Sequence, residues 1–150
     1  MAPMSRVRHA LPVLVAGLLA LTAAGCAGQT SSKSSAEEFT GVKKDVAQVV
    51  EDLQSAESKA DGKKVCNEIL AKPLSASVAK NGKTCKDILD DNLSDVDTSG
   101  MKVTSVTVTG DTAKAVVVSD GGSGDPDRTD TFTLVKDTGA NGVWKISSFG

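Results

Sequence analysis

Carboxylates form the densest group of chemically capable side chains in this 150-residue sequence. Four aspartates and one arginine stand close together around the start of a predicted strand: Asp120, Asp125, Asp127, Arg128 and Asp130. Such a loop could bind a cation or another ligand, and a buried Asp130 could act as a general base. The same Asp and Gly residues are typical of a solvent-exposed hairpin loop, because they favour turn conformations. The hairpin loop is the interpretation that we prefer.

A second acidic run follows the pattern of half a calcium-binding loop. Asp95, Asp97, Ser99 and Gly100 supply the alternating oxygen ligands and the glycine of the first half of an EF-hand. The twelfth position of that loop requires a bidentate glutamate, but Val106 occupies it here. We therefore expect neither a metal ion nor a cofactor, and we assign the run to the turn between the last helix and the first strand.

The first 25 residues have the organisation of a secretory signal peptide. Arg6 and Arg8 lie in a segment without acidic residues, and an apolar stretch follows at residues 10–24. As a helix this stretch would extend about 22 Å, less than the roughly 30 Å of a membrane's hydrocarbon core. Pro12 and Gly17 also interrupt it. A cleaved signal is therefore preferred to a permanent transmembrane helix.

Residues 23–26 resemble the bacterial lipobox, the Leu-Ala-Gly-Cys motif at which lipoprotein signals are cleaved. Ala23 stands where Leu, Val or Ile is more common. The resemblance implies that Cys26 becomes the first mature residue and is linked to diacylglycerol, often with N-acylation. Acyl chains would hold the protein at the extracytoplasmic face of the cell membrane, since each buried methylene contributes about 0.8 kcal/mol. Ordinary signal cleavage without a lipid is the alternative.

Processing would leave the mature chain with few catalytic groups. His9 is the only histidine of the chain and lies in the signal, and the chain has no tyrosine. The usual general base, a Ser-His pair and a phenolic proton donor would therefore all be missing. Loss of Arg6 and Arg8 would lower the formal net charge from -2 to about -4. An acidic chain with 3% aromatic residues lacks the features that nucleic-acid binding requires.

The two remaining cysteines, Cys66 and Cys85, are predicted to form a disulfide. Exported proteins fold in oxidising compartments, where a pair of thiols is readily oxidised. Closing a loop of about 20 residues would stabilise the fold by roughly 3 kcal/mol and would link the second helix to the fourth. The spacing is not the Cys-x-x-Cys of redox enzymes, and two thiols without histidine make an incomplete zinc site.

The mature chain divides into a tether and one domain. Residues 26–36 comprise the lipidated cysteine and a segment without large apolar side chains, rich in Ser and Gly, which predicts flexibility. The folded domain is expected at residues 37–150. From Glu37 to Ala60, apolar residues recur every three or four positions, which predicts an amphipathic helix. Shorter helices are expected up to Asp97, with a break near Pro73 and a turn at Asn81-Gly82.

From Met101 onward, Val, Thr and Ile alternate with polar residues between glycine-rich breaks, which predicts β-strands. Four strands are expected, at Lys102–Thr109, Thr112–Ser119, Arg128–Lys136 and Val143–Phe149. Short connections between them favour an antiparallel meander. Helices followed by strands predict an α+β domain in which the helices pack on one face of the sheet. We expect Trp144, Ile146 and Phe149 to anchor the core.

A long first helix, two short helices with one cysteine each, and a final strand with Trp144, Lys145 and Ile146 form a recognisable combination. It resembles small exported lipoproteins of actinobacteria with a nuclear-transport-factor-2-like fold, over residues 37–149. The resemblance implies a cone in which helices fill the concave side of a curved four-stranded antiparallel sheet. Enzymes of this fold use Asp with Tyr or His inside the cone, so no catalytic residue is carried over, and the fold alone implies no activity.

These observations favour a membrane-anchored, non-enzymatic binding module outside the cytoplasm. Its partner would be an envelope protein or a small apolar ligand inside the cone. A protein partner predicts a filled cone with an exposed apolar patch, whereas a small ligand predicts an open apolar cavity. The alternative is a carboxylate-based enzyme, similar to the isomerases and cyclases of this fold, with an aspartate such as Asp130 as the base.

Overall fold

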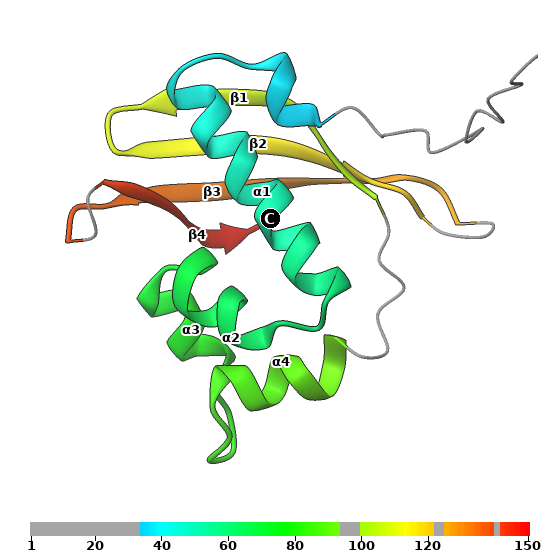
Figure 1. Ribbon diagram of the computed structural model, residues 1–150, viewed down its shortest axis with the longest axis vertical. Coiled ribbons are helices and arrows are strands. Elements are labelled where there is room, and N and C mark those ends of the chain that lie inside the picture. The colour runs from blue at the N-terminus through cyan, green and yellow to red at the C-terminus, as the bar shows by residue number, and fades with distance from the viewer. Residues whose placement is uncertain (1–33, 94–99, 122–124, 140–141) are drawn as a thin grey trace, which may run out of the picture. The chain divides into compact units, whose positions relative to one another are not determined.

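The computed structural model describes residues 34–93, 100–121, 125–139 and 142–150, which form one α+β unit (Figure 1). Helices precede strands along the chain, as the sequence predicts, and they pack against a four-stranded antiparallel sheet. The predicted signal peptide, Cys26, and three residues of the calcium-like run at positions 95, 97 and 99 lie outside the described residues.

The sheet is a meander in which consecutive strands pair with each other. Its strands are β1 (Met101–Thr109), β2 (Thr112–Ser119), β3 (Arg128–Asp137) and β4 (Val143–Phe149). The predicted bounds are confirmed to within one residue at every strand end. Gly110 lies in the turn between β1 and β2 with a φ of +58°, a conformation that glycine adopts without a steric cost.

The long first helix is shorter than predicted. It is α1 (Val42–Ser58), and it crosses one face of the sheet (Figure 1). The predicted start at Glu37 is wrong, because Gly41 adopts a φ of +55° and separates α1 from a short 3-10 turn, η1 (Ser35–Glu38). At the other end Ala60 adopts a φ of +50°, which ends the helix.

Residues of the predicted tether take part in the fold. Ser34 Oγ donates a hydrogen bond to the Glu51 carboxylate of α1 at 2.7 Å, and the Ala36 N–H donates to it at 2.8 Å. The buried hydroxyl of Ser35 donates to Glu51 at 3.2 Å and accepts a hydrogen bond from the Val103 N–H at 3.2 Å. The segment therefore joins α1 to β1, and the folded part begins a few residues before the predicted boundary.

Aliphatic side chains fill the space between α1 and the sheet. Val46 and Val50 of α1 and Leu134 and Ile146 of the sheet are at most 1% exposed. Trp144 is also buried, at 4% exposure, so Trp144 and Ile146 are core residues as predicted. The interior thus consists of close-packed hydrocarbon contributed by both layers.

The prediction that Phe149 anchors the core is wrong. Its side chain is 50% exposed, because Phe149 lies at the end of the edge strand β4, beyond a bulge at Ser147. The ring packs edge-on against Phe132 of β3, with the ring centroids 4.9 Å apart. Phe149 therefore covers one margin of the core and does not fill its centre.

Four short helical segments form a second structural region, called here the helical layer. They are α2 (Gly62–Lys64), a π-helical turn η2 (Val65–Ile69), α3 (Lys72–Val78) and α4 (Cys85–Leu93). Figure 1 shows α2, α3 and α4 grouped on the β4 side of the sheet, away from β1. Pro73 lies in the first turn of α3, where the missing N–H costs no helical hydrogen bond.

Two further contacts fix the course of the chain through the helical layer. Leu70 forms a parallel bridge to Ile146, and the Ala71 N–H donates to the Ile146 carbonyl at 2.8 Å. The predicted turn at Asn81-Gly82 is confirmed, since both residues have a positive φ and flank the point where the chain reverses between α3 and α4. The layer is thereby attached to the outer edge of β4.

Candidate functional site

A disulfide links two segments of the helical layer. Cys66 of η2 is bonded to Cys85, the first residue of α4, with an S–S distance of 2.07 Å and Cα atoms 6.1 Å apart. Both cysteines are 7% exposed. The predicted pairing is therefore confirmed, and it joins a short helical segment that follows the long helix α1 to the last helix before the sheet, as predicted.

A capping box positions the N-terminus of α4 next to this disulfide. The Asp87 N–H donates to Thr84 Oγ1 at 3.3 Å, and the Thr84 N–H donates to the Asp87 carboxylate at 3.0 Å. Thr84 Oγ1 also donates to this carboxylate at 2.6 Å, and these hydrogen bonds lower the pKa of Asp87. Gly62 lets α2 approach α4 closely, since a Cβ there would lie 3.1 Å from the Leu89 Cβ.

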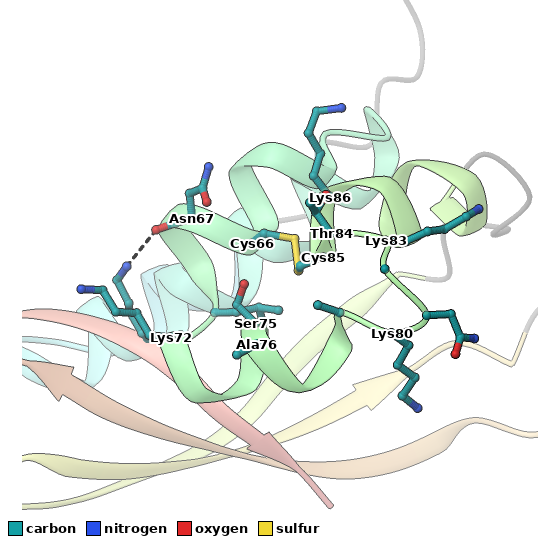
Figure 2. A pocket seen from close by; sticks show the side chains of 15 residues that line it. Cys66, Asn67, Lys72, Ser75, Ala76, Lys80, Lys83, Thr84, Cys85 and Lys86 are labelled. Carbon is teal, nitrogen blue, oxygen red and sulfur yellow. Dashed lines mark hydrogen bonds between the residues drawn. A yellow bond between two sulfur atoms is a disulfide. The ribbon is translucent and has the colours of Figure 1, made fainter.

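The helical layer and β4 form an open hollow of about 800 Å³ beside the disulfide (Figure 2). We call it the lysine hollow after its five lysines, which are Lys72, Lys80, Lys83, Lys86 and Lys145. Small polar and apolar side chains complete the lining, and none of the described lining residues is acidic. An anionic ligand is the kind of molecule that such a lining attracts.

The sequence contains one signal for this hollow, a lysine-rich stretch. Residues 62–86 include six lysines and one acidic residue, Glu68, in a chain whose formal net charge is -2. Four of the five hollow lysines come from this stretch, and the fifth, Lys145, comes from β4. Charge counts along the chain would have located the basic stretch, but only the fold brings Lys145 to it.

Lys145 differs from the other four lysines because its side chain is only 12% exposed. Its Nζ donates to the Asn67 carbonyl at 2.9 Å, and the nearest carboxylate oxygen, from Asp137, is 4.0 Å away. An ammonium group has three donors, and 4.0 Å is too long for a hydrogen bond. Within the described residues, this ammonium group has one hydrogen bond and one long ion pair, which leaves donors for a ligand.

The other four lysines are exposed and extend from the rim. Figure 2 shows the side chains of Lys80, Lys83 and Lys86 directed outward, away from the disulfide. Lys83 Nζ contacts Asp91 at 2.6 Å, and Lys86 Nζ contacts Asp90, and these contacts raise the pKa of both lysines. Exposed ion pairs of this kind contribute little to stability, so a ligand could displace either carboxylate at little cost.

A smaller hollow of about 260 Å³ lies next to the lysine hollow and shares Lys72 and Lys145 with it. Lys136 of β3 and Asp137 also line the smaller one. Lys72 and Lys145 are therefore the two cations that both hollows have in common. In the part of the chain that the structure describes, Lys72 makes no ion pair.

The aspartates of the predicted hairpin loop do not converge on one point. Asp125, Asp127 and Arg128 are exposed, which agrees with a solvent-exposed loop. Asp120 is also exposed and lines a separate hollow of about 430 Å³ near Glu51. Among the described residues, no group of three His, Cys, Asp or Glu side chains is placed to hold a metal ion.

Two carboxylates lie on the side of the sheet that the helices cover. Asp130 is half-buried on β3, two residues before the buried Phe132, so both side chains are on the same face. Glu57 of α1 is half-buried as well, and loss of hydration raises its pKa. The sequence analysis missed Glu57 as a candidate, although it follows the buried Leu53 by four residues, the spacing of one helix face.

Comparison with protein-family models, curated proteins and solved structures finds no match to this chain. The function is therefore argued from the residues and the geometry alone. In the described residues, no helix is both long enough and apolar enough to cross a membrane.

Proposed function

We propose that this protein is a lipid-anchored, extracytoplasmic binding module without enzymatic activity, built on a nuclear-transport-factor-2-like domain. The signal-like segment and the lipobox-like residues before Cys26 support the anchor. The Cys66–Cys85 disulfide supports an oxidising compartment, since such bonds persist mainly outside the cytoplasm. Helices on a four-stranded meander support the fold assignment.

The filled space between α1 and the sheet supports a partner on the outer surface over a small apolar ligand in the interior. Val50, Leu134 and Ile146 meet there with at most 1% exposure, and the three described hollows all lie elsewhere. A small apolar ligand would need a cavity in that position. We therefore infer that partners bind on the outer surface of the domain, where the lysine hollow is the largest described depression.

Membrane fractionation of cells that express the full chain tests the anchor. Cys26→Ser is expected to move the protein from the membrane fraction to the soluble fraction, because no thiol remains for the lipid. Ser31→Ala is the control, since it also alters the predicted tether but keeps the thiol. If the Cys26→Ser protein stayed in the membrane fraction, lipid anchorage at this residue would be rejected.

A neutral apolar dye such as Nile red tests the binding mode. The native protein is expected to produce no increase in dye fluorescence, because its interior is filled by its own side chains. Leu134→Ala is the control for a small void, since truncation of this fully buried side chain opens space for a molecule no larger than benzene and should not admit the dye. Strong dye binding by the native protein would favour a carrier of small apolar molecules instead.

A further inference from the structure

The starting point is the ammonium group of Lys145. Its side chain is 12% exposed, and in the described structure it donates one hydrogen bond, to the Asn67 carbonyl, and forms a long ion pair with Asp137 at 4.0 Å. Because Lys145 lines the lysine hollow, where none of the described lining residues is acidic, an anion in that hollow can approach this group. The geometry thus leaves room for one acceptor-rich ligand at Lys145.

The neighbouring side chains add charge and neutral donors at the same place. Lys72 lines both hollows together with Lys145 and has no ion pair among the described residues. The Ser75 hydroxyl also lines the hollow and makes no hydrogen bond to the described residues, and Figure 2 shows it pointing toward the disulfide. Two ammonium groups and a hydroxyl donor suit a group with several acceptor oxygens.

We propose that the lysine hollow binds a phosphate ester, with the phosphate between Lys72 and Lys145 and the organic part over Leu70, Ala76 and Ala79. This proposal rests on the surface-binding role inferred above and names the chemistry of the ligand. A phosphate ester offers more acceptor oxygens and more negative charge than a carboxylate, and lysine binds phosphate as a point charge. The short apolar residues of the described lining offer a surface for a small organic group.

The lining also argues against a folded protein as the ligand. Trp, Tyr and Arg dominate the energetically important positions of protein interfaces, and none of them is among the described lining residues. The rim lysines Lys83 and Lys86 would add attraction at longer range, since their contacts to Asp91 and Asp90 are exposed and easily exchanged. Lys80 extends outward at the rim in the same way (Figure 2).

The test is a titration of the full chain, kept in a non-ionic detergent, with glycerol 3-phosphate and separately with inorganic phosphate. Binding is followed by the amide signals of Asn67, Lys72, Ser75 and Lys145 in nuclear magnetic resonance spectra. Lys72→Gln is expected to weaken binding about tenfold, the effect of losing one charge-assisted hydrogen bond. Lys114→Gln is the matched control, because it removes an equally exposed charge from β2, which contributes no residue to either hollow.

Lys145→Gln provides a second measurement on the same probe. It should abolish binding, while the amide signals of β1 and β2 keep their native positions and show that the fold is intact. If Lys72→Gln and Lys114→Gln weaken binding equally, the interaction is non-specific charge attraction and the proposal is wrong. Absence of binding by glycerol 3-phosphate and by the vesicles described next would also overturn it.

Vesicles distinguish the two possible sources of the phosphate ester. Vesicles of phosphatidylcholine mixed with phosphatidylglycerol present an anionic phosphate ester as a lipid headgroup. Vesicles of phosphatidylcholine alone are the control. The Cys26→Ser chain is used in this arm, so that an acyl anchor cannot attach the protein to the vesicles. If the protein is retained on the vesicles, and Lys72→Gln abolishes this retention while Lys114→Gln does not, the phosphate ester is a lipid headgroup. If the protein binds only glycerol 3-phosphate, the ligand is a soluble molecule. Failure of both arms leaves membrane fractionation and dye binding unaffected, so the two proposals can fail separately.

Discussion

The sheet with α1 and the helical layer are stabilised in different ways. On the sheet side, long aliphatic side chains such as Leu134 and Ile146 are fully buried. In the helical layer, α3 has no buried residue and α4 buries only Cys85 and Leu93. The layer joins the common core mainly through η2, which buries Val65, Cys66 and Ile69, and it is further held by a disulfide, a capping box and one bridge to β4. The sheet with α1 thus supplies most of the buried core, and the helical layer can expose its lysines to solvent.

The largest effect is expected from a cavity in the sheet half. Leu134→Ala should lower the free energy of unfolding by about 2–5 kcal/mol, because the side chain is 0% exposed and its loss leaves a void. Urea denaturation measures the change. Val135→Ala is the control on the opposite face of β3, where the residue is half-buried and the cost is smaller. Equal losses for the two variants would contradict the distinction between the faces.

Removal of the disulfide should act mainly on the helical layer. The double variant Cys66→Ser with Cys85→Ser is expected to lose roughly 3 kcal/mol of stability. The two cysteines are 19 positions apart, and without the disulfide the unfolded chain gains the conformational entropy of that open loop. Hydrogen exchange should quicken in α2–α4 while β2 and β3 stay protected. The oxidised native protein is the reference. Uniform loss of protection across the sheet would show that the two halves unfold as one unit.

The smallest effect is expected at Glu57, and it depends on pH. Burial raises the pKa of this carboxyl above 4.5 in the folded chain. Ionisation of the group therefore destabilises the folded protein, because the buried carboxylate is poorly hydrated. The stability advantage of the protonated form is therefore present at low pH and is lost as pH rises through the raised pKa. Glu57→Gln should be more stable than the native protein near neutral pH, by less than about 1 kcal/mol.

This difference between Glu57→Gln and the native protein should disappear in acid, where both side chains are neutral. Urea denaturation at several pH values provides the measurement. Glu68→Gln is the control, since Glu68 is an exposed carboxylate of the helical layer. A gap between Glu57→Gln and the native protein that stayed constant with pH would rule out desolvation as its cause.

The predictability of the two halves also differs, for a physical reason. Strand bounds follow from alternation and from glycine-rich turns, which are local properties, so all four strands were predicted within one residue. The disulfide followed from counting the thiols of a chain with a signal-like N-terminal segment. Both inferences need only neighbouring residues or residue types. They therefore do not depend on how distant segments approach each other.

The errors occur where distant residues decide the structure. Ser34 and Ala36 look like tether by composition, but the Glu51 carboxylate, 15 to 17 positions further on, binds them to the fold. Phe149 has the size of a core residue, yet its place beyond a bulge at the end of an edge strand leaves it half-exposed. Such contacts leave no periodic pattern in the sequence.

The candidate site was beyond sequence reasoning for the same reason. Lys145 and Asn67 are 78 positions apart, and the bridge between Leu70 and Ile146 brings their segments together. A scan of charge along the chain finds the lysines of residues 62–86 but gives no hint that a strand lysine joins them. The contacts of Lys145 are visible only in three dimensions.

The contacts at the two outer strands also bear on how the protein behaves in a crowded solution of its own copies. An exposed strand edge can recruit a strand from another molecule and start aggregation. Here the Ala71 N–H donates a hydrogen bond to the Ile146 carbonyl on the outer side of β4. On the other margin, the Ser35 hydroxyl accepts a hydrogen bond from the Val103 N–H of β1. Each margin of the sheet thus has one pairing position already taken, which interrupts the continuous ladder that an incoming strand would need.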